Sequence, residues 1–272
     1  MGERENSSSL SPLYAILQKQ LQDKNKMNRF ENKTILITGG TSGIGLAGAE
    51  RLIREGAKVL VTGRTEKHLN IASEKLGENA IIINDDAEDE ESPNRLAAAV
   101  EKIGKLDGLW LNAAYAIGGN LEEMNKETIE RMFRVNVVSP MLQMGALSKY
   151  IKDGGSVLVT SSSAVYEGQS SVSLYSASKA AILAASRCWA TELAPRKIRV
   201  NSLVPGPITS NLRSVLPNDL RQQFEEELAE VVLLKRVGNP EEAAAVAAFL
   251  LSDDASYVTG SQYIVDGGLL MI

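Results

Sequence analysis

The sequence predicts an α/β protein in a single domain, with a doubly wound, seven-stranded parallel sheet and helices on both faces. Short apolar runs rich in β-branched residues recur along the chain, and helical patterns separate them. A glycine-rich turn follows the first run. Because parallel strands need long crossover connections, this alternation favours a parallel sheet between two helical layers.

Residues 1–26 stand apart from this pattern and are expected to form an N-terminal extension to a domain of residues 27–272. Glu3–Ser9 is polar and is expected to be disordered. Ser11–Lys24 has leucines and an isoleucine at helical spacing, which predicts a short amphipathic helix. A docking helix, a partner-binding helix and a vector-derived extension all remain open.

The first βαβ unit spans the strand Thr34–Thr38, a helix ending near Arg54 and the strand Lys58–Thr62. In a Rossmann-type fold, such a turn between strand and helix binds the pyrophosphate of a dinucleotide. Side chains at the glycines would intrude on the phosphate, and the helix N-terminus adds partial positive charge. The expected cofactor contacts here are Gly39, Thr41, Ser42, Gly43, Ile44 and Gly45.

Residues after the second and third strands bear on the choice of cofactor. An acid after the second strand would bind the ribose hydroxyl of NAD, but the chain has Arg64 there. Arg64 favours the 2′-phosphate of NADP(H), while NAD(H) remains possible and a solvated arginine is the alternative. Asp86, with Ala87, follows the third strand and is placed to meet the adenine amino group, although an acidic loop facing water is equally compatible.

The rest of the chain continues the alternation. Small residues at Asn112, Ala113 and Ala114 follow the fourth strand and suit a cofactor lying across the sheet edge. A long polar stretch, residues 208–237, is a candidate lid. The further strands are expected at Ala80–Asn84, Leu106–Leu111, Ser156–Thr160, Arg199–Val204 and Ser261–Val265, and the further helices at Arg95–Ile103, Glu127–Leu147, around Tyr175 to Leu193, and Pro240–Ser252.

Two features of the helical segments point to chemistry. Tyr175 and Lys179 are four residues apart and therefore share a helix face. An ammonium beside a phenol stabilises phenolate, so a tyrosine there becomes a usable general acid or base. Asn136 lies in mid-helix, where its propensity is poor, and Pro140 invites a kink nearby. A distorted helix can turn a backbone carbonyl toward a site, whereas an asparagine bonded to a neighbouring strand is the structural alternative.

Together these motifs resemble the short-chain dehydrogenase/reductase family over roughly Phe30 to Gly268. The matching pieces are T-G-x-x-x-G-x-G at Thr38–Gly45, Asn112-Ala113-Ala114, Asn136, Ser162, Tyr175-x-x-x-Lys179 and Pro205-Gly206. Ser162 lies thirteen residues before Tyr175, which is the usual spacing of the catalytic serine in that family. Leu111 and Ala114 depart from its common N-N-A-G motif, and the triple Ser161-Ser162-Ser163 leaves the choice of hydroxyl to spacing.

The resemblance implies roles for these residues. Tyr175 would be the general acid in carbonyl reduction and the base in alcohol oxidation, and Lys179 would lower its pKa and bind the nicotinamide ribose. Ser162 would hydrogen-bond the substrate oxygen, and Asn136 would help to hold a water that relays protons to Lys179. The nicotinamide would be flanked by residues between Val204 and Thr209, namely Pro205, Gly206, Ile208 and Thr209.

Composition narrows the function classes. The net charge of −5 argues against a nucleic-acid binder, and no apolar run approaches the roughly 20 residues that span a bilayer. No signal peptide is visible, so we expect a cytoplasmic protein. Cys188 lies in an apolar helical pattern and is expected to be a buried structural thiol. The single His68 argues against a histidine-rich metal site and is expected to be a solvated surface residue.

The sequence therefore predicts an NADP(H)-dependent oxidoreductase acting on a ketone or secondary alcohol. A catalytically silent, dinucleotide-binding redox sensor is the alternative, and an enoyl reductase of the same fold is disfavoured by the Tyr175–Lys179 spacing. The loop Ala116–Leu121, the segment Val165–Leu174 and the lid are expected to shape the substrate pocket. Their residues Ala116, Ile117, Val165, Val172 and Leu174 predict that it is fairly apolar. The resemblance also implies a homo-oligomer, typically a tetramer.

Overall fold

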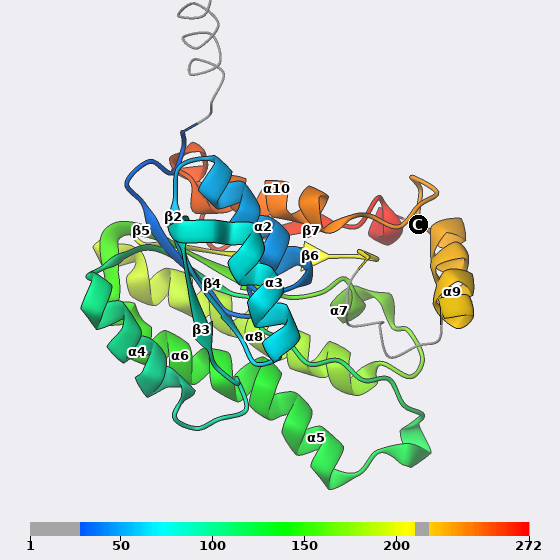
Figure 1. The fold of residues 1–272 in the computed structure, drawn as a ribbon. Coiled ribbons are helices and arrows are strands. Elements are labelled where there is room, and N and C mark those ends of the chain that lie inside the picture. The colour runs from blue at the N-terminus through cyan, green and yellow to red at the C-terminus, as the bar shows by residue number, and fades with distance from the viewer. Residues whose placement is uncertain (1–27, 210–217, 272) are drawn as a thin grey trace, which may run out of the picture.

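The computed structural model describes residues 28–209 and 218–271, and these form the predicted α/β fold (Figure 1). Within them, the sheet has seven strands in the order β3-β2-β1-β4-β5-β6-β7, and each neighbouring pair is parallel. The amphipathic helix and the disordered segment expected before residue 27 lie outside the described residues. The strands are β1 (Thr34–Ile37), β2 (Lys58–Gly63), β3 (Ala80–Asn84), β4 (Leu106–Leu111), β5 (Ile151–Thr160), β6 (Arg199–Pro205) and β7 (Gln262–Val265).

Helices cover both faces of this sheet. In Figure 1, α2, α3 and α10 lie on one face, while α4, α5, α6 and α8 lie on the other. The bounds are α2 (Gly43–Arg54), α3 (Glu66–Leu76), α4 (Ser92–Ile103), α5 (Lys126–Phe133), α6 (Ser139–Leu147), α7 (Ala164–Glu167), α8 (Ser173–Leu193), α9 (Asn218–Val231) and α10 (Pro240–Leu251). None of the described helices combines the length and the apolar character needed to cross a membrane.

Alternating side chains of the buried strands supply two separate cores. Ile35 and Ile37 of β1 pack on the face covered by α2 and α10, and Leu36 between them packs on the face covered by α4, α6 and α8. Successive strand residues point to opposite faces, so an uninterrupted apolar run is what a doubly covered strand requires. Because all neighbouring strands are parallel, their carboxyl ends meet at one edge of the sheet.

Asparagine caps determine where the helices α5 and α10 begin. Asn239 accepts a hydrogen bond from Glu242 N at 3.1 Å, the Glu242 carboxylate accepts one from Asn239 N at 2.9 Å, and Pro240 occupies the first turn of α10. This capping box satisfies donors that the helix itself leaves unpaired. Asn125 caps α5 in the same way by accepting from Thr128 N at 3.0 Å.

The long helix expected at Glu127–Leu147 is instead two helices joined by a π-helical turn, η3 (Arg134–Val138). The expectation of a distortion is confirmed, but its position is Asn136 rather than Pro140. Pro140 lies in the first turn of α6, which follows η3 directly, and it has no N–H to donate to the Asn136 carbonyl four residues earlier.

Two further differences concern the helices beside and after β5. The short helix α7 was not predicted, because four residues are too few for a periodic pattern. The prediction that Cys188 is buried was wrong, since its side chain is exposed. The buried face of α8 includes Ser186, Trp189 and Ala190, so Cys188 falls on the opposite side of the helix.

Candidate active site

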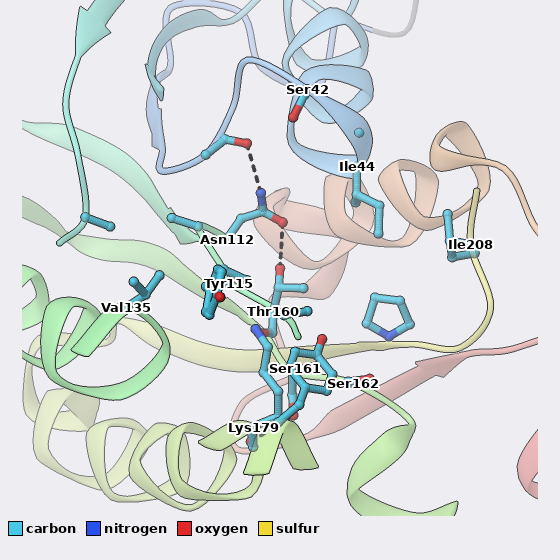
Figure 2. A pocket seen from close by; sticks show the side chains of 18 of the residues that line it. Ser42, Ile44, Asn112, Tyr115, Val135, Thr160, Ser161, Ser162, Lys179 and Ile208 are labelled. Carbon is cyan, nitrogen blue, oxygen red and sulfur yellow. Dashed lines mark hydrogen bonds between the residues drawn. The ribbon is translucent and has the colours of Figure 1, made fainter. Parts of the chain in front are cut away.

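A cavity of about 700 Å³ lies at the carboxyl ends of the strands (Figure 2). It extends from the ends of β2 and β3 to those of β5 and β6, which is where ligands bind in open α/β sheets. Most of the residues predicted from the sequence line it, namely Gly39, Thr41, Ser42, Gly43, Ile44, Arg64, Asp86, Ala87, Asn112, Ala113, Ala114, Ser162, Tyr175, Lys179, Pro205, Gly206 and Ile208.

The glycine-rich turn fits a dinucleotide phosphate, and its glycines serve different purposes. A Cβ added to Gly43, whose φ is +52°, would meet nothing within 4 Å, so its backbone borders open space. A Cβ at Gly39 would come within 2.8 Å of Ala113 Cα, and one at Gly45 within 2.4 Å of the Gly39 carbonyl. The protein's own packing therefore requires Gly39 and Gly45. Ser42 caps α2 without a side-chain hydrogen bond, which leaves the first-turn N–H groups to a ligand.

The Asn112 side chain joins three strand ends beneath the cavity. Its Nδ2 donates to the carbonyls of Thr38 and Gly39, each at 3.2 Å. Its Oδ1 accepts from Thr160 Oγ1 at 3.1 Å, a bond drawn in Figure 2. The amide thus fixes the glycine turn after β1 against the end of β5, which leads to Ser162.

Tyr175 and Lys179 of α8 both line the cavity, as their spacing predicts. Lys179 Nζ lies 5.9 Å from the centroid of the Tyr175 ring and donates to the Thr160 carbonyl at 3.0 Å. Burial lowers the pKa of Lys179 from 10.5 to about 8, because desolvation disfavours the ammonium form. Most of these side chains therefore stay cationic at neutral pH, and a positive charge remains beside the phenol.

The three consecutive serines after β5 separate by their contacts. Ser161 is buried, and its Oγ donates to the Lys179 carbonyl at 3.0 Å. Ser163 is also buried, whereas Ser162 is half-buried. Ser162 Oγ accepts from Ala164 N at 3.2 Å, and this bond leaves its proton available to another acceptor. The contacts and burial agree with the spacing, which favours Ser162.

Asn136 does not line the cavity. Its Oδ1 accepts from Tyr115 N, and its Nδ2 donates to the Tyr115 carbonyl, both at 2.8 Å. Nδ2 also donates to Ser178 Oγ at 3.0 Å. The side chain thus holds the segment after β4 against α8, while Tyr115 itself lines the cavity.

Arg64 lies at the adenosine end of the expected cofactor site and is paired with two acids. Its Nη1 donates to Asp86 Oδ2 at 3.1 Å and to Glu88 Oε1 at 2.8 Å. Burial by itself lowers the pKa of Arg64, but the hydrogen bonds to Glu88 and Asp86 outweigh it and raise that pKa. Glu88 also accepts from Arg131 Nη2 at 2.8 Å, and Arg131, then Arg64, hold the pKa of Glu88 below its usual value.

Several predicted contacts lie elsewhere, and several lining residues were not predicted. Gly45 and Thr209, like Asn136, are not among the lining residues. His68, expected on the solvated surface, is half-buried and lines the cavity. Residues close after strand ends carried a detectable signal, whereas His68 carried none. Leu228 lies in the stretch expected to be a lid, of which residues 210–217 lie outside the described residues. The lining residues outside the predicted site also include Thr62, Thr65, Asp85, Glu88, Tyr115, Val135, Thr160, Ser161 and Ser163. Glu167 and Gln169, which also line the cavity, lie in the segment expected to shape the substrate pocket.

Some of the residues predicted to form the apolar substrate pocket line the cavity, and others do not. Ala116, Ile117 and Val172 line the cavity, and Val165 and Leu174 do not. Among residues 28–209 and 218–271, no group of three or more His, Cys, Asp or Glu side chains is placed to hold a metal ion.

Comparisons with known proteins agree with this geometry. A family model described as enoyl-(acyl carrier protein) reductase matches residues 39–270. Dehydrogenase/reductase SDR family member 4 of Sus scrofa is 38% identical over 88% of this chain and 87% of its own. Tropinone reductase-like 3 of Erythroxylum coca is 34% identical over 88% of this chain and 94% of its own. A solved glucose/ribitol dehydrogenase of the SDR type from Brucella melitensis is similar at a TM-score of 0.84 and 32% identity, covering 90% of this chain and 99% of that one.

Proposed function

The chain belongs to the short-chain dehydrogenase/reductase family, and from this premise we propose that it transfers hydride between NADP(H) and a ketone or secondary alcohol. It is an oxidoreductase acting on CH–OH and C=O groups, and its family uses nicotinamide dinucleotides. The observation that carries the finer proposal is that Ser162, Tyr175 and Lys179 line one cavity together with Gly43 of the phosphate turn.

Each side chain of this set has a distinct task. The bound nicotinamide dinucleotide supplies the hydride in reduction and accepts it in oxidation. In reduction, the Tyr175 hydroxyl gives its proton to the carbonyl oxygen, and Ser162 donates a hydrogen bond to the same oxygen as negative charge develops there. The Lys179 ammonium stabilises the phenolate that remains on Tyr175.

For Asn136 we propose a proton-relay role through its main chain. Its side-chain amide is engaged with Tyr115 and Ser178. A π-helical turn leaves a main-chain carbonyl without the regular helical partner, and such turns are frequent at functional sites. That carbonyl is suited to hold a water on the path to Lys179.

The proposed NADP(H) preference rests on Arg64 and on the absence of an acid directly after β2. Arg64 lines the cavity and is exposed, so a 2′-phosphate can reach its guanidinium. Asp86 and Glu88 compete for the same donors. A bound 2′-phosphate must therefore displace these two carboxylates from Arg64 or share its guanidinium with them. NAD(H) binding would leave both ion pairs in place.

Two further proposals concern the substrate and assembly. We propose a fairly apolar carbonyl substrate because Ala116, Ile117 and Val172 line the cavity. We also propose a homo-oligomer, since the adjoining η3 and α6 expose Val138, Met141 and Leu142 by about half. The redox-sensor alternative has no supporting observation in the site, and the cytoplasmic location stays a prediction.

The proposed chemistry is tested by Tyr175→Phe, which keeps the ring and removes the proton donor. We expect the variant to lose carbonyl-dependent oxidation of NADPH, followed by absorbance, and to keep cofactor binding, followed by titration. Tyr257→Phe removes a phenol from an exposed position outside the cavity and should remain active. Turnover retained in Tyr175→Phe would refute the assigned role.

A further inference from the structure

The charged side chains of the cavity fall into two regions. At the β2 and β3 end, Arg64 pairs with Asp86 and Glu88. Asp85 at that end is paired with Arg95, whose Nε lies 2.8 Å from Asp85 Oδ1. Beyond Lys179, on the β5 side, Glu167 brings a carboxylate into the lining. Within the described part of the chain, no lysine or arginine is paired with that carboxylate.

Two hydrogen bonds hold the short helix α7, which carries Glu167. It ends α7, a helix that begins two residues after Ser162. Ser176 Oγ of α8 donates to the Ala164 carbonyl at 2.8 Å and fastens the start of α7. The Tyr166 hydroxyl is hydrogen-bonded to the Gln262 side chain on β7. Glu167 is itself half-buried and lines the same cavity as Ser162.

Apolar side chains line the same cavity as this carboxylate. Ala116, Ile117 and Val172 line the same cavity, and so does Leu228 of α9. A ligand that fills the cavity would exclude water from this carboxylate, and a charge in such surroundings interacts more strongly with a partner charge than it would in water. A carboxylate covered by a neutral ligand would be disfavoured, whereas a charge-assisted hydrogen bond from a cationic ligand would stabilise it.

We infer that the substrate carries a cationic amine in addition to its carbonyl or hydroxyl group, and that Glu167 binds this amine while the apolar walls bind the carbon frame. This substrate class rests on the proposed ketone chemistry. Ser162 and Tyr175 bind the reacting oxygen, and Glu167 fixes the other end of the molecule. Glu167 acts as a specificity-determining residue and takes no part in proton or hydride transfer.

The test compares two ketones of nearly equal shape, 1-methylpiperidin-4-one and 4-methylcyclohexanone. The carbonyl lies opposite the ring nitrogen in the piperidone and opposite the methyl-bearing carbon in the cyclohexanone. The piperidone is largely protonated at neutral pH and the cyclohexanone is neutral. We expect wild-type kcat/KM to favour the piperidone, and Glu167→Gln to reduce that preference about tenfold, the effect of one charge-assisted hydrogen bond. The kcat/KM for methylcyclohexanone should change less than twofold.

Glu192→Gln is the matched control, because it removes the same charge from an exposed position on α8 outside the cavity. Its preference for the piperidone should equal that of the wild type. Equal preference in wild type and Glu167→Gln would overturn the inference. A permanently charged N,N-dimethylpiperidinium ketone adds a second arm, because it keeps the charge without an N–H donor. Its preference over methylcyclohexanone should be smaller than that of the piperidone and should also be lost in Glu167→Gln, and a charge preference that Glu167→Gln leaves intact would contradict the inference.

Binding measurements separate failure of this inference from failure of the proposed reaction. Thermal shift of the cofactor-loaded protein is measured with the alcohols that correspond to the two ketones. A larger shift with the cationic alcohol, lost in Glu167→Gln, supports the amine site even where no turnover occurs. Equal shifts with both alcohols in the wild type contradict the amine site even where both ketones are reduced.

Discussion

The side-chain amide of Asn136 pairs with both backbone polar groups of Tyr115, each at 2.8 Å. Asn136 lies in the π-helical turn, and Tyr115 follows β4 at the cavity wall. The Asn136 amide thus bonds the main chain of Tyr115 as a neighbouring strand would, and it holds the segment after β4 in position.

Replacing Asn136 by Ala should therefore destabilise the fold and damage the site together. Two backbone groups of Tyr115 and the Ser178 hydroxyl would lose partners, so we expect a loss of about 2–4 kcal/mol in the free energy of unfolding. Urea unfolding measures this value, and kcat should also fall. Asn125→Ala, which removes a helix cap, should cost about 1 kcal/mol and keep activity. Equal stability losses in the two variants would contradict the special role of the Asn136 pair.

The lowered pKa of Lys179 predicts that stability increases with pH. Below about pH 8 the lysine is protonated in both folded and unfolded chains. Between about 8 and 10.5 the folded protein releases the proton first, so the unfolded state binds more protons and stability rises, by at most about 3 kcal/mol. Above that range the gain is complete. Unfolding free energies of wild type and Lys179→Met across this range give the contribution as their difference.

The control for this series is Lys105→Met, an exposed lysine before β4. Its pH dependence should follow the wild type. A slope that is the same in wild type and in Lys179→Met would mean that the amine is hydrated in the folded protein.

Glu88 is predicted to weaken NADPH binding, because it accepts hydrogen bonds from Arg64 and Arg131 at the adenosine end. Glu88→Gln should raise the ratio of kcat/KM for NADPH over NADH about tenfold, since less negative charge would oppose a 2′-phosphate. Arg64→Ala should lower the same ratio by at least a similar factor. Arg54→Ala removes an exposed arginine outside the cavity and should leave it unchanged. An unaltered ratio in both site variants would assign cofactor choice to other residues.

Alanine substitutions at the three consecutive serines should differ in their effects on kcat and stability, because the three hydroxyls have different surroundings. Ser162→Ala should reduce kcat about 100-fold or more, the effect of losing one donor to a developing oxyanion. Ser163→Ala should keep most of the activity. Ser161→Ala removes a buried bond to the Lys179 carbonyl, so it should appear mainly as lower stability. Steady-state kinetics with thermal unfolding separates these outcomes, and a larger loss of kcat in Ser163→Ala would reassign the role.

The proposed homo-oligomer is tested on the exposed face of η3 and α6. Leu142→Glu places a charge among Val138 and Met141 and should reduce the mass measured by light scattering. Glu127→Gln on the neighbouring α5 alters a charge without adding one to that face and should leave the mass unchanged. A wild-type mass equal to that of one chain would contradict the proposal directly.

The sequence predicts the sheet well because most strands contain a short run of apolar, often β-branched residues, and β3 and β4 begin and end where their patterns do. Tyr175 and Lys179 were predictable because helix geometry alone places positions four apart on one face. The pairs of Glu88 with Arg131 and of Asn136 with Tyr115 were not, since they join residues far apart in sequence. Only the packed arrangement of helices and strand ends brings these groups together.

The π-helical turn at Arg134–Val138 also lets the two helices that it joins, α5 and α6, face different neighbours. A π turn holds one residue more than a regular turn, so it rotates everything that follows by about 100° around the axis. The residues of α5 can thereby pack against α8 while those of α6 keep their own phase against α4. Shortening this stretch by a single residue would restore an unbroken helix, and it would force one of the two halves to turn its apolar stripe outward.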